Sequence, residues 1–155
     1  MLLPPFLMSR EDGMADNRGI VTICGTDYEV ESSIGATIVY KNEFKGKLDK
    51  PYNGNMGDDM LALYGEIESG SNSDLYYGFD IEAVFRVAWA MAVAAGSTNE
   101  SWDSFLGRLV HESVTLVDVA GVYQTCVRDL GERTFFRLPA GLSDDIESYE
   151  EQEAE

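Results

Sequence analysis

The side chains best suited to catalysis are few in this sequence and stand apart from one another. His111 is the one histidine, and it lies between Val110 and Glu112 at the expected end of a helix. A histidine acts as a general base when a nucleophile and an orienting carboxylate lie beside it, and no local motif supplies them. We therefore interpret His111 as a surface residue that caps a helix, and we predict that the protein is not an enzyme.

Residues that could hold a metal ion or a phosphate lack the spacing that such sites need. Asp58 and Asp59 lack the regular oxygen-ligand spacing of a calcium loop, so we interpret them as the start of a helix. The glycines in Gly54–Gly57 are not followed by the Lys-Ser/Thr pair of a phosphate loop. Cys24 and Cys126 are expected to be buried, reduced thiols of a cytosolic protein, with a disulfide as the less favoured alternative. We predict no metal and no cofactor.

Charge sets a second limit on function. The chain of 155 residues has a formal net charge of −17, and residues 143–155 hold seven acidic side chains and no basic one. Because phosphate backbones and anionic membranes bind basic surfaces, we expect neither nucleic acid nor a membrane as a partner. The length suits one domain, and an apolar content of 45% is enough for one core.

The other elements must be arranged around the apolar stretch at residues 79–96. It contains six alanines, and alanine is the best helix former. Asp80 is expected to cap the start of this helix, and Gly96 to follow its last turn. Glu82 and Arg86, four residues apart, form its narrow polar seam. A helix that is apolar nearly all round is buried, and this one is too short for a bilayer, so we predict the central helix of a core.

A β-hairpin and further helices are expected on either side of this central helix. A run rich in β-branched residues predicts a strand at Ile20–Cys24, and alternating apolar residues predict a second at Asp27–Glu31, with Gly25 in the turn. Capping residues and helical periodicity predict helices from Ser32 or Ser33 to about Phe44, from Asp58 or Asp59 through Tyr64, from Thr98 or Asn99 through Val110, and from Thr115 to a stop at Gly131.

The predicted fold class is therefore mostly α, with a small N-terminal β-hairpin followed by a compact bundle of about five helices. Residues 20–138 are expected to form this single α-rich domain. Residues 1–19 are expected to be a disordered N-terminal segment in which Met1, Met8 or Met14 is the true start. Residues 139–155 are expected to be a disordered acidic tail, because they are too polar to add to a core.

Three short motifs follow one another in the chain. Ile38–Phe44 (Ile-Val-Tyr-Lys-Asn-Glu-Phe) comes after the hairpin, Trp89–Ala92 (Trp-Ala-Met-Ala) lies in the central helix, and Thr98–Leu106 contains Trp102. In this order they resemble the tail assembly chaperone family of long-tailed (siphophage-type) bacteriophages, over residues 20 to about 130. Lys45 departs from the family pattern, which usually has glycine at that point.

The resemblance implies a protein without catalytic activity that binds the tape-measure protein of the phage tail. Members of the family keep the hydrophobic helices of that protein soluble while tail-tube subunits polymerise around it. In many members a programmed ribosomal frameshift makes a second, longer product whose extension recruits the tail-tube protein. The family works in the host cell cytoplasm and is absent from the mature virion. The oligomeric state is left open.

Two amphipathic helices offer aromatic anchors for such a partner. One ends at Phe44, with Ile34 and Ile38 sharing a neighbouring face, and the other begins near Trp102. Aromatic side chains dominate protein–protein contacts, although the same spacing also fits packing in the core. The predicted partner-binding residues are Tyr40, Phe44, Trp102 and Phe105. The acidic tail is expected to keep the complex dispersed or to shield the binding groove until the partner arrives.

The net charge leaves a second hypothesis open, a phage-encoded acidic interaction protein such as a nucleic-acid mimic that inhibits a host enzyme. A mimic of this kind needs ordered rows of carboxylates on its folded body, whereas the charge here is densest in the unpatterned tail. Salt-sensitive binding to a DNA-binding enzyme would favour the mimic. Salt-insensitive binding to an apolar helical partner would favour the chaperone.

Overall fold

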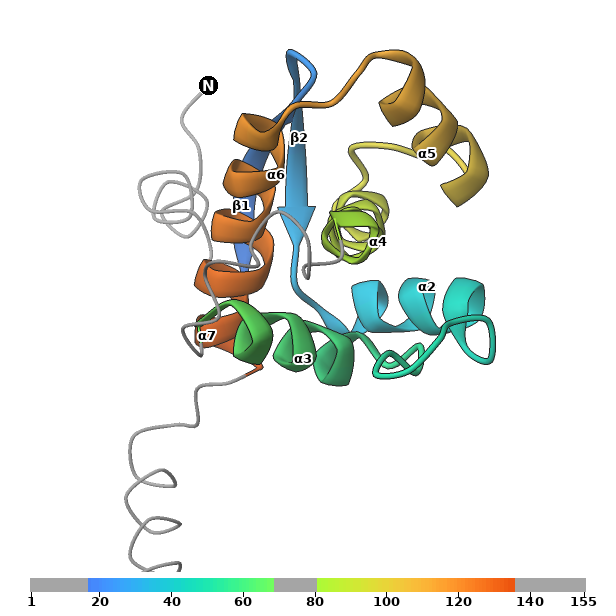
Figure 1. Ribbon diagram of the computed structural model, residues 1–155, viewed down its shortest axis with the longest axis vertical. Coiled ribbons are helices and arrows are strands. Elements are labelled where there is room, and N and C mark those ends of the chain that lie inside the picture. The colour runs from blue at the N-terminus through green and yellow to red at the C-terminus, as the bar shows by residue number, and fades with distance from the viewer. Residues whose placement is uncertain (1–16, 69–80, 136–155) are drawn as a thin grey trace, which may run out of the picture.

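The computed structural model describes residues 17–68 and 81–135, which form a hairpin and a set of helices around one core. The predicted fold class is confirmed, because a two-stranded antiparallel hairpin precedes four separate helices and one longer helical rod (Figure 1). Most of the predicted N-terminal segment, the Asp80 cap and the whole acidic tail lie outside the described residues.

The hairpin consists of β1 (Arg18–Ile23) and β2 (Thr26–Glu31). Cys24 and Gly25 form the two-residue turn, and both have positive φ angles, 51° and 82°. The glycine turn is confirmed, although it starts one residue earlier than predicted, since such turns need positive φ at both central positions. β1 also begins two residues early, because Arg18 bonds to Glu31 at the open end of the hairpin, at 2.8 Å.

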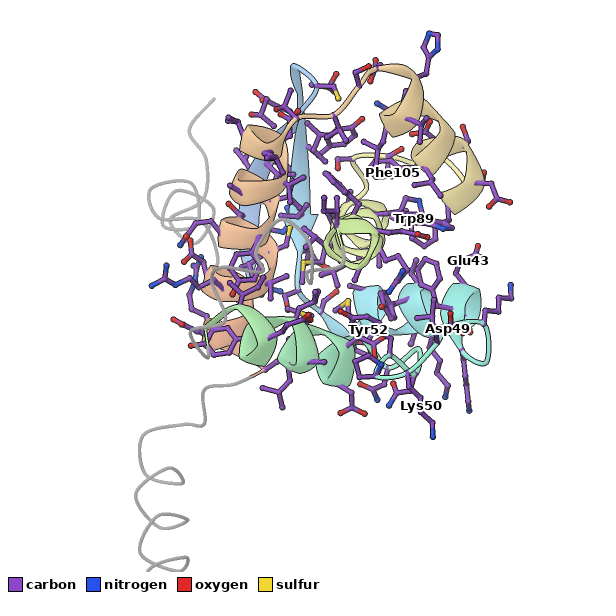
Figure 2. The ribbon with its side chains drawn as sticks, viewed as in Figure 1. Glu43, Asp49, Lys50, Tyr52, Trp89 and Phe105 are labelled. Carbon is purple, nitrogen blue, oxygen red and sulfur yellow. The ribbon has the colours of Figure 1, made fainter. Side chains whose placement is uncertain are left out.

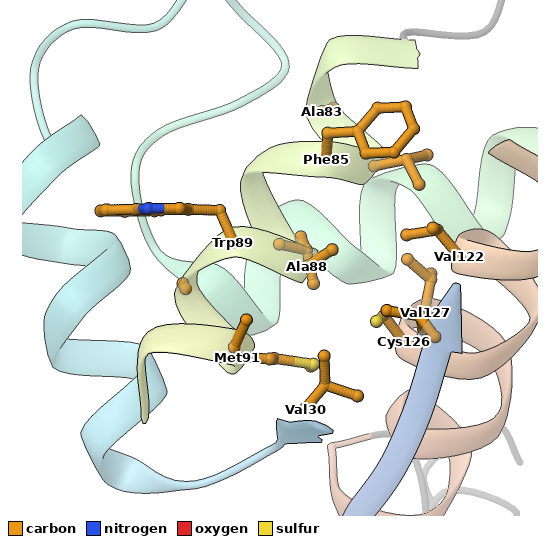
Figure 3. Packing of buried hydrophobic residues seen from close by; sticks show 14 of the residues in the cluster. Val30, Ala83, Phe85, Ala88, Trp89, Met91, Val122, Cys126 and Val127 are labelled. Atoms are coloured by element: carbon orange, nitrogen blue, oxygen red, sulfur yellow. The ribbon is translucent and has the colours of Figure 1, made fainter. Parts of the chain in front are cut away.

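α4 (Ile81–Ala94) is the centre of the core, as predicted. Every residue from Ala83 to Ala92 is buried, and α4 packs against β2, α2, α3, α5 and the helical rod (Figure 1). Figure 3 shows Met91 directed toward Val30 of β2, whereas Trp89 points to the opposite side of the helix. A helix buried on all sides fixes the distances between the elements around it.

The end of α4 also matches its prediction. Gly96 has a φ angle of +80°, and its amide donates to the carbonyl of Val93 at 3.0 Å. The amide of Ser97 donates to the carbonyl of Ala92, also at 3.0 Å. This pair of bonds is a Schellman motif, which needs a left-handed residue just past the helix end, so Gly96 ends α4 for a conformational reason.

α2 (Ile34–Phe44) and α3 (Met56–Glu68) lie on one side of α4. Ser33 caps α2, as predicted, by accepting a hydrogen bond from the amide of Ala36 at 3.2 Å. The predicted start of α3 at Asp58 or Asp59 is wrong, because Asn55 accepts from the amide of Asp58 at 3.0 Å and thereby caps the helix earlier. Both aspartates therefore lie in the first turn of α3.

α5 (Trp102–His111) covers another side of α4. Its cap is Ser101, which accepts from the amide of Ser104 at 3.2 Å, so the predicted cap at Thr98 or Asn99 is wrong. Leu109 of this helix is buried, whereas Val110 is 73% exposed because it lies at the margin of the buried side. α5 is thus a helix packed through one face only.

The rod consists of α6 (Leu116–Val122), η2 (Tyr123–Asp129), which is wound as a π-helix, and α7 (Leu130–Thr134). The predicted start at Thr115 is confirmed. Thr115 and Asp118 form a capping box, in which each side chain accepts a hydrogen bond from the other residue's backbone amide, at 3.2 and 3.1 Å. The predicted stop at Gly131 is wrong. Gly131 is buried inside the rod. The turn that follows it is anchored by a hydrogen bond of 2.7 Å between the hydroxyl groups of Thr134 and Ser32.

The two cysteines lie apart in the fold as free thiols. Cys126 is fully buried in the rod, as predicted, whereas Cys24 is only partly buried because it forms the hairpin turn. Burial raises the pKa of both thiols, and the carboxylate of Asp118 adds to the rise for Cys24. Within the described ranges, no helix is long and apolar enough to cross a membrane.

Candidate partner-binding surface

The structure brings the four predicted partner-binding residues together inside the core. Tyr40, Phe44, Trp102 and Phe105 are at most 6% exposed. Ring centroids of successive residues in this order lie 4.8, 5.3 and 6.1 Å apart, so the rings form a continuous aromatic chain from α2 to α5. These side chains join the helices to one another and do not reach solvent. Their role in partner binding stays a prediction.

The hydroxyl of Tyr40 is held by a buried carboxylate. Asp59 is fully buried and accepts from Tyr40 at 2.7 Å, and from the amides of Asn53 and Gly54 at 2.9 and 3.1 Å. These bonds fix the loop before α3 against α2. Burial raises the pKa of Tyr40 well above its usual range, so the phenol stays protonated and keeps donating. Asp59 therefore has a structural role that sequence reasoning missed.

Arg86 is the second buried polar group beside this aromatic chain. Its side chain is 4% exposed, and its guanidinium carbon lies 5.7 Å from the ring centroid of Phe44 and 5.2 Å from that of Tyr52. The predicted pair with Glu82 is present at 3.8 Å. The seam is nevertheless asymmetric, because Glu82 is half-exposed and Arg86 is inside. Cation–π contacts offset part of the cost of burying such a charge.

A second arginine ties the α4–α5 loop to the hairpin. Arg108 donates to both carboxylate oxygens of Glu100, at 2.8 and 3.1 Å, and to the hydroxyl of Tyr28. Its guanidinium carbon also lies 5.3 Å from the ring centroid of Phe105. The hydrogen bonds from Arg108 lower the pKa of Glu100. This cluster positions the loop, and every polar atom in it already has a protein partner.

The structure places the candidate catalytic residue on the surface. His111 is exposed in the last turn of α5. In the part of the chain that the structure describes, no three His, Cys, Asp or Glu side chains lie close enough to hold a metal ion.

The outer face of α2 is the strongest candidate. Ile34, Ile38 and Asn42 follow at four-residue intervals and form one stripe, and we call these three residues the outer face. Ile34 is 81% exposed and Ile38 is 51% exposed. The sequence correctly predicted that the isoleucines share a face, but that face meets solvent instead of the core.

An open groove of about 860 Å³ begins at Asn42. Its apolar lining is Val39 of α2 with Trp89 and Val93 of α4, and its polar lining is Asn42, Glu43 and the loop at residues 96–101. Figure 2 shows Trp89 and Glu43 on the side of α2 that faces α5. The groove and the two isoleucines are therefore neighbours on α2, because Val39, which lines the groove, directly follows Ile38.

On its other flank, the outer face borders a group of lysines. All four lysines of the chain lie between residues 41 and 50. We call Lys41, Lys45, Lys47 and Lys50 the lysine cluster. In Figure 2, Lys50 extends away from the helices on the side of α2 opposite Trp89 and Phe105. The sequence carried this signal plainly, since a chain of net charge −17 gathers its lysines in one segment.

Other exposed apolar side chains are more scattered. Leu116 and Val117 form a pair at the start of α6 and are 52% and 81% exposed. Ile20, Leu61 and Val110 lie on three different elements and are more than half exposed. Single exposed apolar residues are normal on soluble proteins. The α2 pair differs from these in lying next to Val39 and Asn42, which line the open groove.

Comparisons with family models, with curated proteins and with solved structures give no match for this chain. The family resemblance thus remains a matter of three short motifs.

Proposed function

We propose that the protein is a tail assembly chaperone of a long-tailed bacteriophage. It acts in the host cell cytoplasm, binds the tape-measure protein and keeps it soluble while tail-tube subunits polymerise around it, and it is not part of the mature virion. The proposal is supported by the three ordered motifs and by the predicted hairpin-and-bundle fold. The single observation that carries it is the exposed pair Ile34 and Ile38 on α2, which lies next to Val39 and Asn42 of the groove lined by Trp89.

The geometry suits an amphipathic helix as the bound segment. A partner helix presents apolar residues every three to four positions, and it is recognised by an apolar strip with a groove beside it. Here the two isoleucines are four residues apart, and Val39 and Val93 contribute further partly buried apolar surface in the groove. The net charge of −17 keeps a complex with an apolar partner dispersed.

The charge distribution on the folded body disfavours the nucleic-acid mimic. Several body carboxylates are paired with bases: Glu29 and Glu31 with Arg18, Glu43 with Lys47, Glu82 with Arg86, and Glu100 and Glu112 with Arg108. A surface that imitates a phosphate backbone needs rows of unpaired carboxylates. These paired carboxylates are unsuited to such a row, so the chaperone is the better supported function.

The test is co-expression with a fragment of the tape-measure protein from the same phage genome. The fragment should be soluble with the wild-type chain and insoluble when the chain carries Ile34→Ser and Ile38→Ser. The matched control is Leu116→Ser with Val117→Ser, because these side chains have nearly the same exposures, 52% and 81%. The control variant should rescue the fragment as well as the wild-type chain does.

Two outcomes would count against the proposal. If the wild-type chain left the fragment insoluble, the chaperone function would be wrong. If the α6 substitutions abolished rescue and the α2 substitutions did not, the function would stand but the surface would be misassigned. Gene order offers a separate check, because the family places its gene between those of the tail-tube and tape-measure proteins.

A further inference from the structure

The lysine cluster concentrates positive charge on an otherwise acidic protein. Within the described residues, Lys41, Lys45 and Lys50 are exposed and make no ion pair, and Lys47 pairs only with Glu43, at 3.5 Å. The other basic residues of the chain are arginines, spread from Arg10 to Arg137. The cluster therefore offers several ammonium groups whose charge is not matched by a described carboxylate.

Lys41 and Lys45 also line a hollow between α2 and the start of α3. Its volume is about 380 Å³, and its other walls include Thr37, Asn53, Asn55 and Asp58. The hollow lies beside the outer face, because Lys41 follows Ile38 by three residues on the same helix. An extended acidic segment would find the two ammonium groups along one side, and the amides of Asn53 and Asn55 along the other, where Asn53 also donates to the carboxylate of Asp58 at 3.2 Å.

The described chain ends close to this hollow. A Cβ atom built on Gly57 would lie 3.2 Å from the ring of Phe135, so that ring packs on the first turn of α3. Asn55 and Asp58, which flank Gly57 in sequence, are wall residues of the hollow. The residues that follow Phe135 therefore start beside the first turn of α3, whose residues Asn55 and Asp58 line the hollow.

We propose that the acidic tail, residues 143–155, binds the lysine cluster of its own chain. The tail holds seven carboxylates and no base, which complements four lysines. The nine residue steps from Phe135 to Asp144 span up to about 30 Å when extended, which is ample from the start of α3. Tethering at this length gives an effective concentration in the millimolar range, so weak ion pairs suffice.

Binding at this place has a consequence for the outer face, and this consequence rests on the proposed function. A tail held along Lys41 and Lys45 lies within one helical turn of Ile38 and competes with a partner for that end of the outer face. The tail then acts as an internal, exchangeable cover for the apolar strip. Its charge keeps the free chaperone from self-association through that strip, and a partner of higher affinity displaces it.

The experiment compares amide ¹H–¹⁵N spectra of full-length chains at low salt and in 1 M NaCl. One variant neutralises the tail: E147Q, E150Q, E151Q and E153Q. A second neutralises the cluster: K41Q, K45Q, K47Q and K50Q. A third removes positive charge nearby but outside the cluster: R128Q and R133Q. Arg128 and Arg133 are exposed on the rod that leads to Phe135, so this variant is the matched control.

Neutralising the tail should shift amides at residues 41–58 and leave those of the hairpin unchanged. Neutralising the cluster should shift the amide signals of the tail. A variant that carries both the tail and the cluster substitutions should show no loss of contact beyond that of either set alone, since both sets remove the same contact. The arginine control should move neither set beyond its own neighbours. In 1 M NaCl, where screening acts over about 3 Å, the wild-type tail amides should match those of the variants.

The proposal would be overturned if tail neutralisation left amides 41–58 unmoved at low salt. It would also be overturned if the shifts weakened on tenfold dilution, because the tail would then bind a second copy. Neither outcome depends on the tape-measure protein. The proposed function can therefore fail while tail binding holds, and tail binding can fail while the proposed function holds. If both hold, the tail-neutralised variant should bind the tape-measure fragment several-fold more tightly at low salt.

Discussion

The inner and outer faces of α2 are both rich in large apolar side chains, yet they meet different surroundings. On the inner face, Ala36, Tyr40 and Phe44 are at most 3% exposed. On the outer face, Ile34 and Ile38 are 81% and 51% exposed. Hydrophobicity alone does not separate the two sets, since isoleucine is at least as apolar as tyrosine.

Specific side-chain contacts distinguish the inner face of α2 from its outer face. Tyr40 reaches a buried acceptor in Asp59, and Phe44 meets Trp89, Trp102 and the Arg86 guanidinium. Aromatic rings gain from edge contacts and from a nearby cation in addition to burial. The isoleucine side chains cannot form directional contacts of this kind. Directional contacts therefore distinguish the inner face of α2, whereas apolar residues without such contacts form the face that is available to a partner.

The largest difference between the two faces should appear when Phe44 is truncated. Phe44→Ala removes a ring that contacts three aromatic side chains and should lower the free energy of unfolding by about 3–5 kcal/mol. Guanidinium titration followed by tryptophan fluorescence measures this, because Trp89 and Trp102 both border the ring. Ile38→Ala is the matched outer-face control. An equal loss in both variants would remove the distinction between the faces.

Removing the Tyr40 hydroxyl from the inner face should lower the free energy of unfolding less than truncating Phe44. Tyr40→Phe keeps the ring but deprives the buried Asp59 of its 2.7 Å donor, so the free energy of unfolding should fall by about 1–3 kcal/mol. The two backbone donors to Asp59 remain. Urea denaturation of the variant and of Tyr64→Phe, whose hydroxyl bonds to Glu132 in a partly buried place, compares the sites. A larger effect at Tyr64 would contradict the role of Asp59.

Glu100, which lines the groove, should make a smaller, pH-dependent contribution to the free energy of unfolding. Hydrogen bonds from Arg108 lower the pKa of Glu100 in the folded chain, so its stabilising effect is present above the unfolded pKa of about 4.3. That effect is lost as the pH falls through the lower, folded pKa. Glu100→Gln should therefore reduce stability at pH 7 by about 1 kcal/mol or less.

Thermal unfolding of both chains between pH 7 and pH 3 checks this prediction. The two melting temperatures should converge as the pH falls below 4. A difference that persisted at pH 3 would mean that the side chain acts through packing and not through its charge.

Much of the fold could be predicted from local pattern. The Ala-rich run at 79–96 has no polar face to expose, and Thr115 with Asp118 forms a capping box whose geometry is local. The end of the rod could not be predicted in this way. Gly131 usually ends a helix, and it is overridden by a distant contact between Thr134 and Ser32.

The candidate site was harder to predict than the fold for the same physical reason. Tyr40 and Phe44 have the composition of a binding site, but Asp59 and Arg86, far away in sequence, draw them inside. Ile34 and Ile38 have the composition of a core, but no element of the described chain covers them. The lysine cluster was visible in the sequence, whereas its closeness to Phe135 depends on how α3 and α7 pack.

The smallest effect on stability should come from the outer face itself. Ile34→Ser with Ile38→Ser replaces two exposed side chains on a helix held by its other side, so the free energy of unfolding should change by no more than about 0.5 kcal/mol. The same guanidinium titration measures it. This result matters for the proposed function, because a variant of normal stability that fails to rescue the tape-measure fragment has lost a binding surface. A loss above 2 kcal/mol would instead show that the isoleucines support the fold, and failed rescue would then say nothing about where the partner binds.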